Sequence, residues 1–285
     1  MNAEIGESSE QEIRKRVDAA LAGMTRPLVA LSGGVDSALL AARVSAVGGG
    51  AATLVGAMYA GEETERARMV ARLLGLPHHE VFVDALSVEE IRSNPVDRCY
   101  HCRRFGMGRL VELAAAEGYG TVVDGENADD AGDYRPGVRA MRELGLRAPL
   151  REAGMTKAMV RRWSAELGLP TADLPAAACL ASRFPYGSPL TAAALRRVER
   201  AEAYLRGQGL RQVRVRHYGD TACIEAEREA IPRLAASPLR EKILDAFFGF
   251  GYSRVSVDLA GYRMGSLNPV GITDSGPAPQ DGATA

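Results

Sequence analysis

The 285-residue chain has no apolar run of the roughly 18 residues that a membrane span needs. Its first dozen residues are polar and acidic, unlike a signal peptide. Four cysteines are too few for a disulfide scaffold, and a formal net charge of −1 gives no global attraction to nucleic acid or anionic membrane. We therefore expect a cytoplasmic protein with reduced cysteines and with no nucleic-acid or membrane partner.

The sequence also lacks the G-x-x-x-x-G-K-[ST] loop of many nucleotide-binding proteins. In its place, an apolar run at 28–31 ends at the segment 32–37, Ser-Gly-Gly-Val-Asp-Ser, and a helical pattern follows. Glycines permit a tight turn, the N–H groups of a helix start point toward an anion, and a carboxylate suits Mg²⁺. The segment resembles the SGGxDS loop of enzymes that cleave ATP to AMP and pyrophosphate, although an ordinary strand–helix turn uses the same residue types. The candidate ATP-binding residues here are Ser32, Gly33, Gly34, Asp36 and Ser37.

Strand and helix patterns alternate along the first part of the chain, after an amphipathic helix at 10–23. Strands are expected at 27–31, 52–58, 79–84 and 120–124, and the helices between them at 37–47, 62–75 and 103–118. This alternation predicts an α/β fold in which a parallel sheet has helices on both faces. Ligands of such sheets bind at the carboxyl ends of the strands.

A second polar segment, 124–130, follows the fourth predicted strand. Gly125 permits a turn, Asn127 offers an amide, and Asp129 is one of several carboxylates that suit Mg²⁺ or a ribose. Asp, Asn and Gly clusters are commonly only turns. Because 32–37 and 124–130 both follow strands of one predicted sheet, we expect them to face the same site.

The pattern changes near residue 186. A helix is expected at 191–206, strands at 211–216, 220–226 and 253–258, and a pair of helices within 228–249. These elements predict a smaller α+β domain. The expected organisation is an N-terminal helix and tail at 1–25, a nucleotide-binding domain at 26–186, an α+β domain at 187–268 and a disordered tail at 269–285.

Cys99 and Cys102 form a C-x-x-C pair, which is typical of a redox pair or half a metal site and also occurs by coincidence. A second pair that would complete a four-thiolate zinc site is missing. Together with the distant Cys179, they would give three thiolates, enough for three irons of a cubane cluster whose fourth iron takes an exogenous ligand such as sulfide. Cys223 lies in a predicted strand, and we expect a small buried residue there.

Basic residues lie near Cys179 and recur in the second domain. Arg183 follows the cysteine closely, and a thiol near guanidinium groups forms the nucleophilic thiolate more readily. Strand alternation places Arg214 and Arg216 on one face, which suits a phosphate or a carboxylate-rich ligand, or is a solvated face. Glu225 is a salt-bridge partner for these arginines or a further ligand contact.

At the level of longer motifs, the chain resembles the LarE family of ATP-dependent sulfur transferases, which act in the biosynthesis of a nickel-pincer cofactor. The resemblance covers about residues 26–268. It rests on SGGVDS at 32–37, NPVDRCYHC at 94–102, VVDGENADDAGDYRPG at 122–137, PLREAGMTKAMVR at 149–161, ACLASRFPYG at 178–187, RQVRVRHYGD at 211–220 and LAGYRMGSLN at 259–268.

The resemblance implies a pyridinium mononucleotide substrate with ring carboxylates, ATP and Mg²⁺. ATP would adenylate a carboxylate, and a sulfur nucleophile would then displace AMP to leave a thiocarboxylate. In one branch of the family the cysteine matching Cys179 gives up its own sulfur, and in another three cysteines bind a [4Fe–4S] cluster that carries sulfide. Since Cys99 and Cys102 are both present, the cluster branch is favoured. The family also implies substrate contacts at Arg214, Arg216 and Glu225, and a homo-oligomer, trimer or hexamer. We add Arg183, beside Cys179, as a further candidate substrate contact.

Three other functions fit parts of the sequence. A tRNA thiolase uses similar chemistry, but such enzymes usually have a basic surface for the phosphate backbone. The net charge of −1 and the lack of a zinc-ribbon set of cysteines argue against this function here. An ammonia-using synthetase would give Cys179 no task. A non-catalytic nucleotide-binding iron–sulfur or redox sensor would not release pyrophosphate from ATP in the presence of a carboxylate substrate.

Overall fold

The computed structural model describes residues 2–132, 136–175, 178–263 and 267, and its chain divides into two compact units. The first unit comprises Met1–Ala85 and Cys99–Ala177, and the second comprises Leu86–Arg98 and Ala178–Ala285. Within the described ranges no helix is long and apolar enough to cross a membrane. The predicted tail 269–285 lies outside the described residues, and the predicted domain limits stay a proposal.

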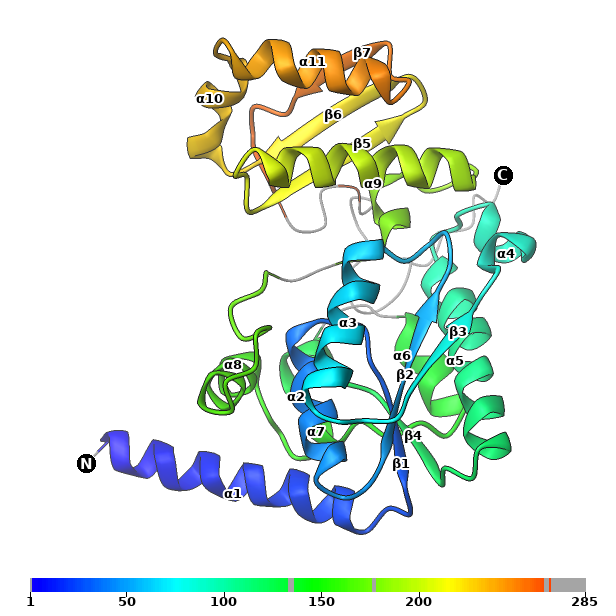
Figure 1. The fold of residues 1–285 in the computed structure, drawn as a ribbon, viewed down its shortest axis with the longest axis vertical. Coiled ribbons are helices and arrows are strands. Elements are labelled where there is room, and N and C mark those ends of the chain that lie inside the picture. Colours follow the sequence, from blue (N-terminus) through cyan, green and yellow to red (C-terminus); the bar gives the residue numbers. More distant parts are fainter. Residues whose placement is uncertain (1, 133–135, 176–177, 264–266, 268–285) are drawn as a thin grey trace, which may run out of the picture. The chain divides into compact units, whose positions relative to one another are not determined.

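The first unit is built on a four-stranded sheet whose neighbouring strands are all parallel (Figure 1). Its strands, in the spatial order β3-β2-β1-β4, are β1 (Pro27–Ala30), β2 (Gly50–Val55), β3 (His78–Phe82) and β4 (Thr121–Val123). The predicted α/β class is confirmed, and each predicted strand lies within a few residues of an observed one. The segments 32–37 and 124–130 follow the carboxyl ends of the adjacent strands β1 and β4.

Helices cover both faces of this sheet because successive strand residues point to opposite faces. Val29 packs in the core that includes residues of α1, α2, α3 and α8, whereas Leu28 packs in the core that includes Leu110 of α5. The helical elements of this part of the chain are α1 (Asn2–Ala22), α2 (Val35–Ser45), α3 (Gly61–Leu73), η1 (Ala85–Ser87), α4 (Glu89–Arg92), α5 (Arg98–Ala116), η2 (Ala128–Gly132), α6 (Pro136–Glu143), α7 (Pro149–Glu152) and α8 (Lys157–Glu166).

The second unit contains a three-stranded sheet in the order β5-β6-β7. Strands β5 (Val213–Tyr218) and β6 (Thr221–Ala226) are antiparallel, and β7 (Arg254–Val257) runs parallel to β6. Its helical elements are η3 (Leu180–Arg183), α9 (Ala192–Gly207), η4 (Arg228–Ala230), α10 (Ile231–Ala235) and α11 (Leu239–Gly249). One sheet face, with Val215 and Ile224, packs in a core with Leu205 of α9 and Phe247 of α11. The strand residues that alternate with these core residues face the other side of the sheet and are mainly polar, for example Arg214, Arg216 and Glu225.

A short segment from the middle of the chain, Leu86–Arg98, belongs to the second unit. The fully buried Asn94 holds it there: its side-chain Nδ2 donates to Pro185 O at 2.8 Å, and its own carbonyl accepts from Gly187 N at 2.8 Å. Leu190 N also donates to Arg92 O at 2.8 Å. The sequence did not predict that Leu86–Arg98 belongs to the second unit, because this depends on contacts between residues about ninety positions apart.

Candidate active site

The segment 32–37 is closed on itself by its two serine side chains. Ser37 Oγ donates to Gly34 O at 3.1 Å and accepts from Ser32 N at 3.2 Å, and the two serine hydroxyls lie 3.0 Å apart. Gly34 is the N-cap of α2, with Asp36 in the first helical turn. The main-chain N–H groups of a helix start have no partner within the helix, so the loop presents donors that suit phosphate oxygens.

Gly33 is required by both its conformation and its surroundings. Its φ of 78° lies in the left-handed region, and a Cβ there would lie 2.4 Å from Glu63 O of α3. A larger residue would clash with main chain rather than with a flexible side chain. The glycine therefore lets the loop pass close against the start of α3.

The segment 124–130 packs directly against this loop. A Cβ on Gly125 would lie 2.9 Å from Ser37 N, so the two main chains approach as closely as glycine allows. Asn127 Nδ2 donates to Asp36 Oδ1 at 3.2 Å. The structure therefore brings together the two segments that the sequence predicted to face one site.

Lys157, which the sequence reasoning did not single out, completes this arrangement from the first position of α8. Its Nζ forms an ion pair with Asp36 Oδ2, and its main-chain N–H donates to Asp129 Oδ2 at 2.8 Å. Asp129 N in turn donates to Asn127 Oδ1 at 3.0 Å. A lysine in the first turn opposes the helix dipole, which is a sequence signal that would have pointed to this residue.

Beside these residues, Glu126 is buried between two arginines. Arg103 Nη1 lies 2.9 Å from Glu126 Oε1, and Arg151 Nη1 lies 2.6 Å from Oε2. Burial and the charge of Asp124 raise the pKa of Glu126, against the opposing effect of the two arginines. Burial opposes the charge on Arg103, but Asp124, Glu126 and Cys99 outweigh it and raise the pKa of Arg103.

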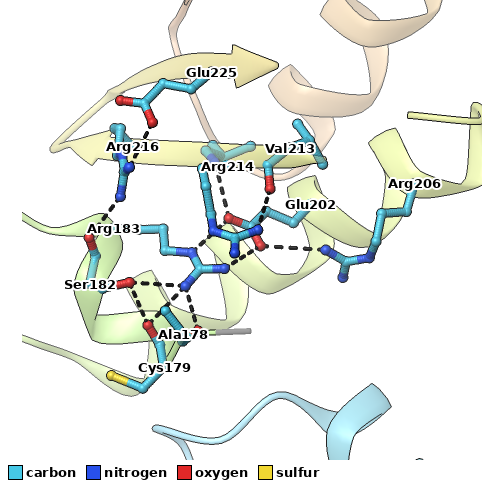
Figure 2. A network of polar contacts seen from close by, with 11 residues as sticks. Ala178, Cys179, Ser182, Arg183, Glu202, Arg206, Val213, Arg214, Arg216 and Glu225 are labelled. Carbon is cyan, nitrogen blue, oxygen red and sulfur yellow. Dashed lines mark hydrogen bonds and ion pairs between the residues drawn. The ribbon is translucent and has the colours of Figure 1, made fainter. Parts of the chain in front are cut away.

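In the second unit, Arg183 fixes the main chain around Cys179 (Figure 2). It donates to Ala178 O at 2.6 Å and to Cys179 O at 2.9 Å, while a two-pronged contact at 2.8 and 2.9 Å joins it to Glu202 of α9. Figure 2 shows the Cys179 sulfur pointing away from this guanidinium. Arg183 thus braces the cysteine's main chain rather than its thiol.

Glu202 is buried together with Arg183 and has several donors around it. Burial alone would raise its pKa, but the hydrogen bond and charge of Arg183, the charge of Arg214 and the N–H of Val215 outweigh burial and hold the pKa of Glu202 below its usual range. The carboxylate therefore stays ionised inside the unit and ties α9, β5 and η3 together.

The guanidinium of Arg98, another residue that the sequence reasoning missed, lies beside the Cys179 sulfur. Arg98 Nη2 lies 4.0 Å from Cys179 Sγ, and Nη1 contacts Asn94 Oδ1 and, at 3.2 Å, Ala181 O. Arg98 is 3% exposed and immediately precedes Cys99 in the chain. Its position supplies the positive charge beside the thiol that the sequence analysis assigned to the arginines after Cys179.

The predicted arginine pair lies on the polar face of β5. Arg216 donates to Glu225 Oε2 at 2.6 Å and to Ser182 O at 2.9 Å, so Glu225 is its salt-bridge partner (Figure 2). Arg214 donates to Val213 O at 2.8 Å and lies over the Tyr262 ring. Burial and the charge of Arg183 lower the pKa of Arg214. Their proposed substrate contacts stay a prediction.

All four cysteines lie in the described residues, and none forms a disulfide. Cys99, exposed, and Cys102 lie in the first two turns of α5, three residues apart on one side of the helix. Cys223, expected to be buried, is half-buried because it alternates with the core residues Ala222 and Ile224 and faces the polar side of β6. Among the described residues, no three His, Cys, Asp or Glu side chains are grouped as metal ligands.

Comparisons with known proteins show what this chain is similar to. A model of the family described as asparagine synthase matches residues 9–186. An uncharacterised protein of Synechocystis is 42% identical over 250 residues, which cover 87% of this chain and 93% of the relative. The pyridinium-3,5-bisthiocarboxylic acid mononucleotide synthase of Lactiplantibacillus plantarum is 36% identical over 254 residues, 88% of this chain and 91% of that protein. The tRNA-specific 2-thiouridylase MnmA of Azorhizobium caulinodans is 32% identical over 194 residues, only 53% and 49% of the two chains.

Proposed function

Because the chain belongs to the LarE family of pyridinium-3,5-bisthiocarboxylic acid mononucleotide synthases, and its residues 9–186 match the asparagine synthase family, we propose that it is an ATP-dependent sulfur transferase. Its substrate would be a pyridinium mononucleotide with ring carboxylates. The observation that supports this most strongly is the junction of the loop 32–37 with the segment 124–130 at Asp36. Anion-binding N–H groups, carboxylates and a lysine meet there.

In the first step, a carboxylate oxygen of the substrate attacks the α-phosphorus of ATP. The bond between that phosphorus and the bridging oxygen breaks, and pyrophosphate leaves with the electron pair. The N–H groups at the start of α2 would hold phosphate oxygens, and Lys157 would stabilise the charge that develops on the leaving pyrophosphate. Asp36 and Asp129 fit Mg²⁺, which prefers carboxylate oxygens and would neutralise phosphate charge when bound.

In the second step, a sulfur nucleophile attacks the activated carbonyl carbon, and AMP leaves to give a thiocarboxylate. If Cys179 is the donor, its thiol loses a proton and forms a thioester. Removal of the Cys179 Cα proton then breaks its Cβ–S bond, which frees the thiocarboxylate and leaves dehydroalanine. Arg98, whose Nη2 lies 4.0 Å from the sulfur, would orient the Cys179 side chain for this step.

A [4Fe–4S] cluster is the other sulfur source, and it would supply an exogenous sulfide. The three cysteines that the cluster would need, Cys99, Cys102 and Cys179, are not disulfide-bonded and each is at least partly exposed, although the described structure does not group them as metal ligands. These three thiolates would hold the cluster and leave one iron open. In that case the protein's cysteines are unchanged by turnover.

Anaerobic purification with iron and sulfide analysis, beside the intact protein mass before and after turnover, separates the two sources. Iron together with an unchanged mass supports the cluster, and loss of H₂S from Cys179 supports the sacrificial cysteine. Cys179→Ala should abolish sulfur transfer on either route and keep ATP binding, whereas Cys223→Ala should keep both. Full sulfur transfer by Cys179→Ala would refute the assignment.

A tRNA thiolase is the second candidate, because similarity to the thiouridylase covers about half of this chain. Release of pyrophosphate that depends on tRNA rather than on the pyridinium mononucleotide would favour it. The homo-oligomer that the family implies, trimer or hexamer, is a further proposal, and light scattering of the purified protein tests it.

A further inference from the structure

The carbonyl of Leu31, the residue that follows β1 (Pro27–Ala30) and precedes the loop, is held by a side chain of the strand next to β1. Thr53 Oγ1 of β2 donates to Leu31 O at 2.7 Å, and Thr53 is 3% exposed. His78 Nε2 of β3 lies 2.8 Å from the same hydroxyl. Because a hydroxyl has one proton, which goes to Leu31 O, His78 Nε2 must be the donor to Thr53. The neighbouring hydrogen bond therefore fixes the histidine tautomer.

The N–H end of the same peptide group is also held. Ser32 N, which follows the Leu31 carbonyl, donates to Ser37 Oγ at 3.2 Å. The Leu31–Ser32 peptide plane is therefore fixed at both ends, by Thr53 on one side and by the loop serine on the other. The orientation of this peptide sets the direction in which the chain enters Gly33 and the start of α2.

We propose that Thr53 and His78 are positioning residues for the nucleotide loop. They form a hydrogen-bonded series from His78 of β3 through Thr53 of β2 to the carbonyl of Leu31, just after β1, and this series sets the loop before ATP arrives. Neither residue would touch ATP. The inference rests on the proposed use of the loop 32–37 for ATP.

Thr53→Val tests it, since valine keeps the branched shape and removes the hydroxyl. The buried Leu31 carbonyl then loses its partner, and ATP affinity should weaken by roughly 5- to 50-fold, measured by calorimetry without the second substrate. Thr53→Ser should restore most of the affinity. Thr171→Val is the matched control, because Thr171 is also fully buried and its hydroxyl has no hydrogen-bond partner in the described structure. Its ATP affinity should equal that of the wild type.

His78 gives a second, independent readout. Nitrogen NMR of the histidine rings should show His78 as the Nε2–H tautomer in the wild type, and Thr53→Val should change that signal. His78→Leu removes the donor but leaves the Thr53–Leu31 bond, so ATP affinity should fall in the same direction by less. If Thr53→Val does not fold, the ATP affinity of His78→Leu still tests the positioning role.

The outcomes separate the two proposals. Wild-type protein that does not bind ATP would overturn the proposed function, and this inference with it. Wild-type protein that binds ATP, with Thr53→Val and His78→Leu binding it equally well, would overturn the positioning role alone. Equal losses in Thr53→Val and Thr171→Val would also overturn it, since the effect would then be one of general packing.

Discussion

At the scale of single residues, the ion pair between Lys157 and Asp36 joins the start of α8 to the loop 32–37. Both side chains are partly exposed, at 31% and 23%, so the pair adds little to stability. A weak pair is easily exchanged. On the proposed function, Lys157 would leave Asp36 for a phosphate oxygen, and the carboxylate would then be available to a cation.

Lys157→Met should lower the rate of pyrophosphate release by about 10²-fold or more, because a charged donor to the developing phosphate charge is lost. The folded state should change little. Pyrophosphate release with ATP and the carboxylate substrate measures the effect. Lys15→Met, on the exposed face of α1, is the control and should behave as the wild type. An active Lys157→Met enzyme would refute the role.

The residues that the sequence predicted and those that it missed differ in how far along the sequence their contact partners lie. The loop 32–37 could be recognised because its serines and glycines contact each other within a few positions. Lys157 pairs with Asp36 across 121 positions, Arg98 reaches Cys179 across 81, and Thr53 reaches Leu31 across 22. No local pattern contains such a pair, so only the fold identifies them.

At the scale of elements, Gly33 connects β1 to α2 and lets α3 approach. Gly33→Ala should abolish measurable ATP binding, because its Cβ would lie 2.4 Å from Glu63 O. Gly168→Ala is a close control: Gly168 also has a positive φ, 66°, but nothing lies within 4 Å of its Cβ position. Backbone strain of about 1 kcal/mol is common to both variants. A difference in ATP affinity between them therefore measures the effect of the clash with Glu63 O. Equal ATP affinities would contradict this explanation.

The Arg183–Glu202 pair joins η3 to α9, and both side chains are nearly fully buried. Arg183→Met should cost about 3–5 kcal/mol of unfolding free energy, because Glu202 keeps a buried charge without its main partner. Adding Glu202→Gln removes that charge and keeps an acceptor for Val215 N, so part of the stability should return. Urea denaturation measures both variants. A double variant less stable than Arg183→Met would contradict the argument.

The strands and their parallel arrangement could be predicted because strand and helix patterns alternate regularly before residue 124. The membership of Leu86–Arg98 in the second unit could not, since it depends on Asn94 and its partners near residue 186. Cys223 was misjudged for a different reason. The alternation in 221–226 places Cys223 on the same strand face as Glu225 and opposite Ala222 and Ile224, and this signal was overlooked.

At the scale of the whole molecule, each unit contains a half-buried histidine. Burial is the main cause that lowers the pKa of His78 and of His217 below the ordinary 6.5. The unfolded chain therefore binds protons first as the pH falls through about 6.5, and stability should fall with it. The urea midpoint should drop between about pH 7.5 and pH 5.5, and less in a His78→Gln/His217→Gln variant. A midpoint that rises toward acid would contradict the sign.

If the protein uses ATP bound at the loop 32–37 to exchange a carboxylate oxygen for sulfur, the products can be identified by mass spectrometry. The small molecules are analysed after incubation with ATP, Mg²⁺, a pyridinium dicarboxylate mononucleotide and a sulfide source. We expect AMP, pyrophosphate and a mononucleotide in which sulfur has replaced oxygen, all absent with Asp36→Ala. ADP in place of AMP, or AMP with an unchanged mononucleotide, would contradict this expectation.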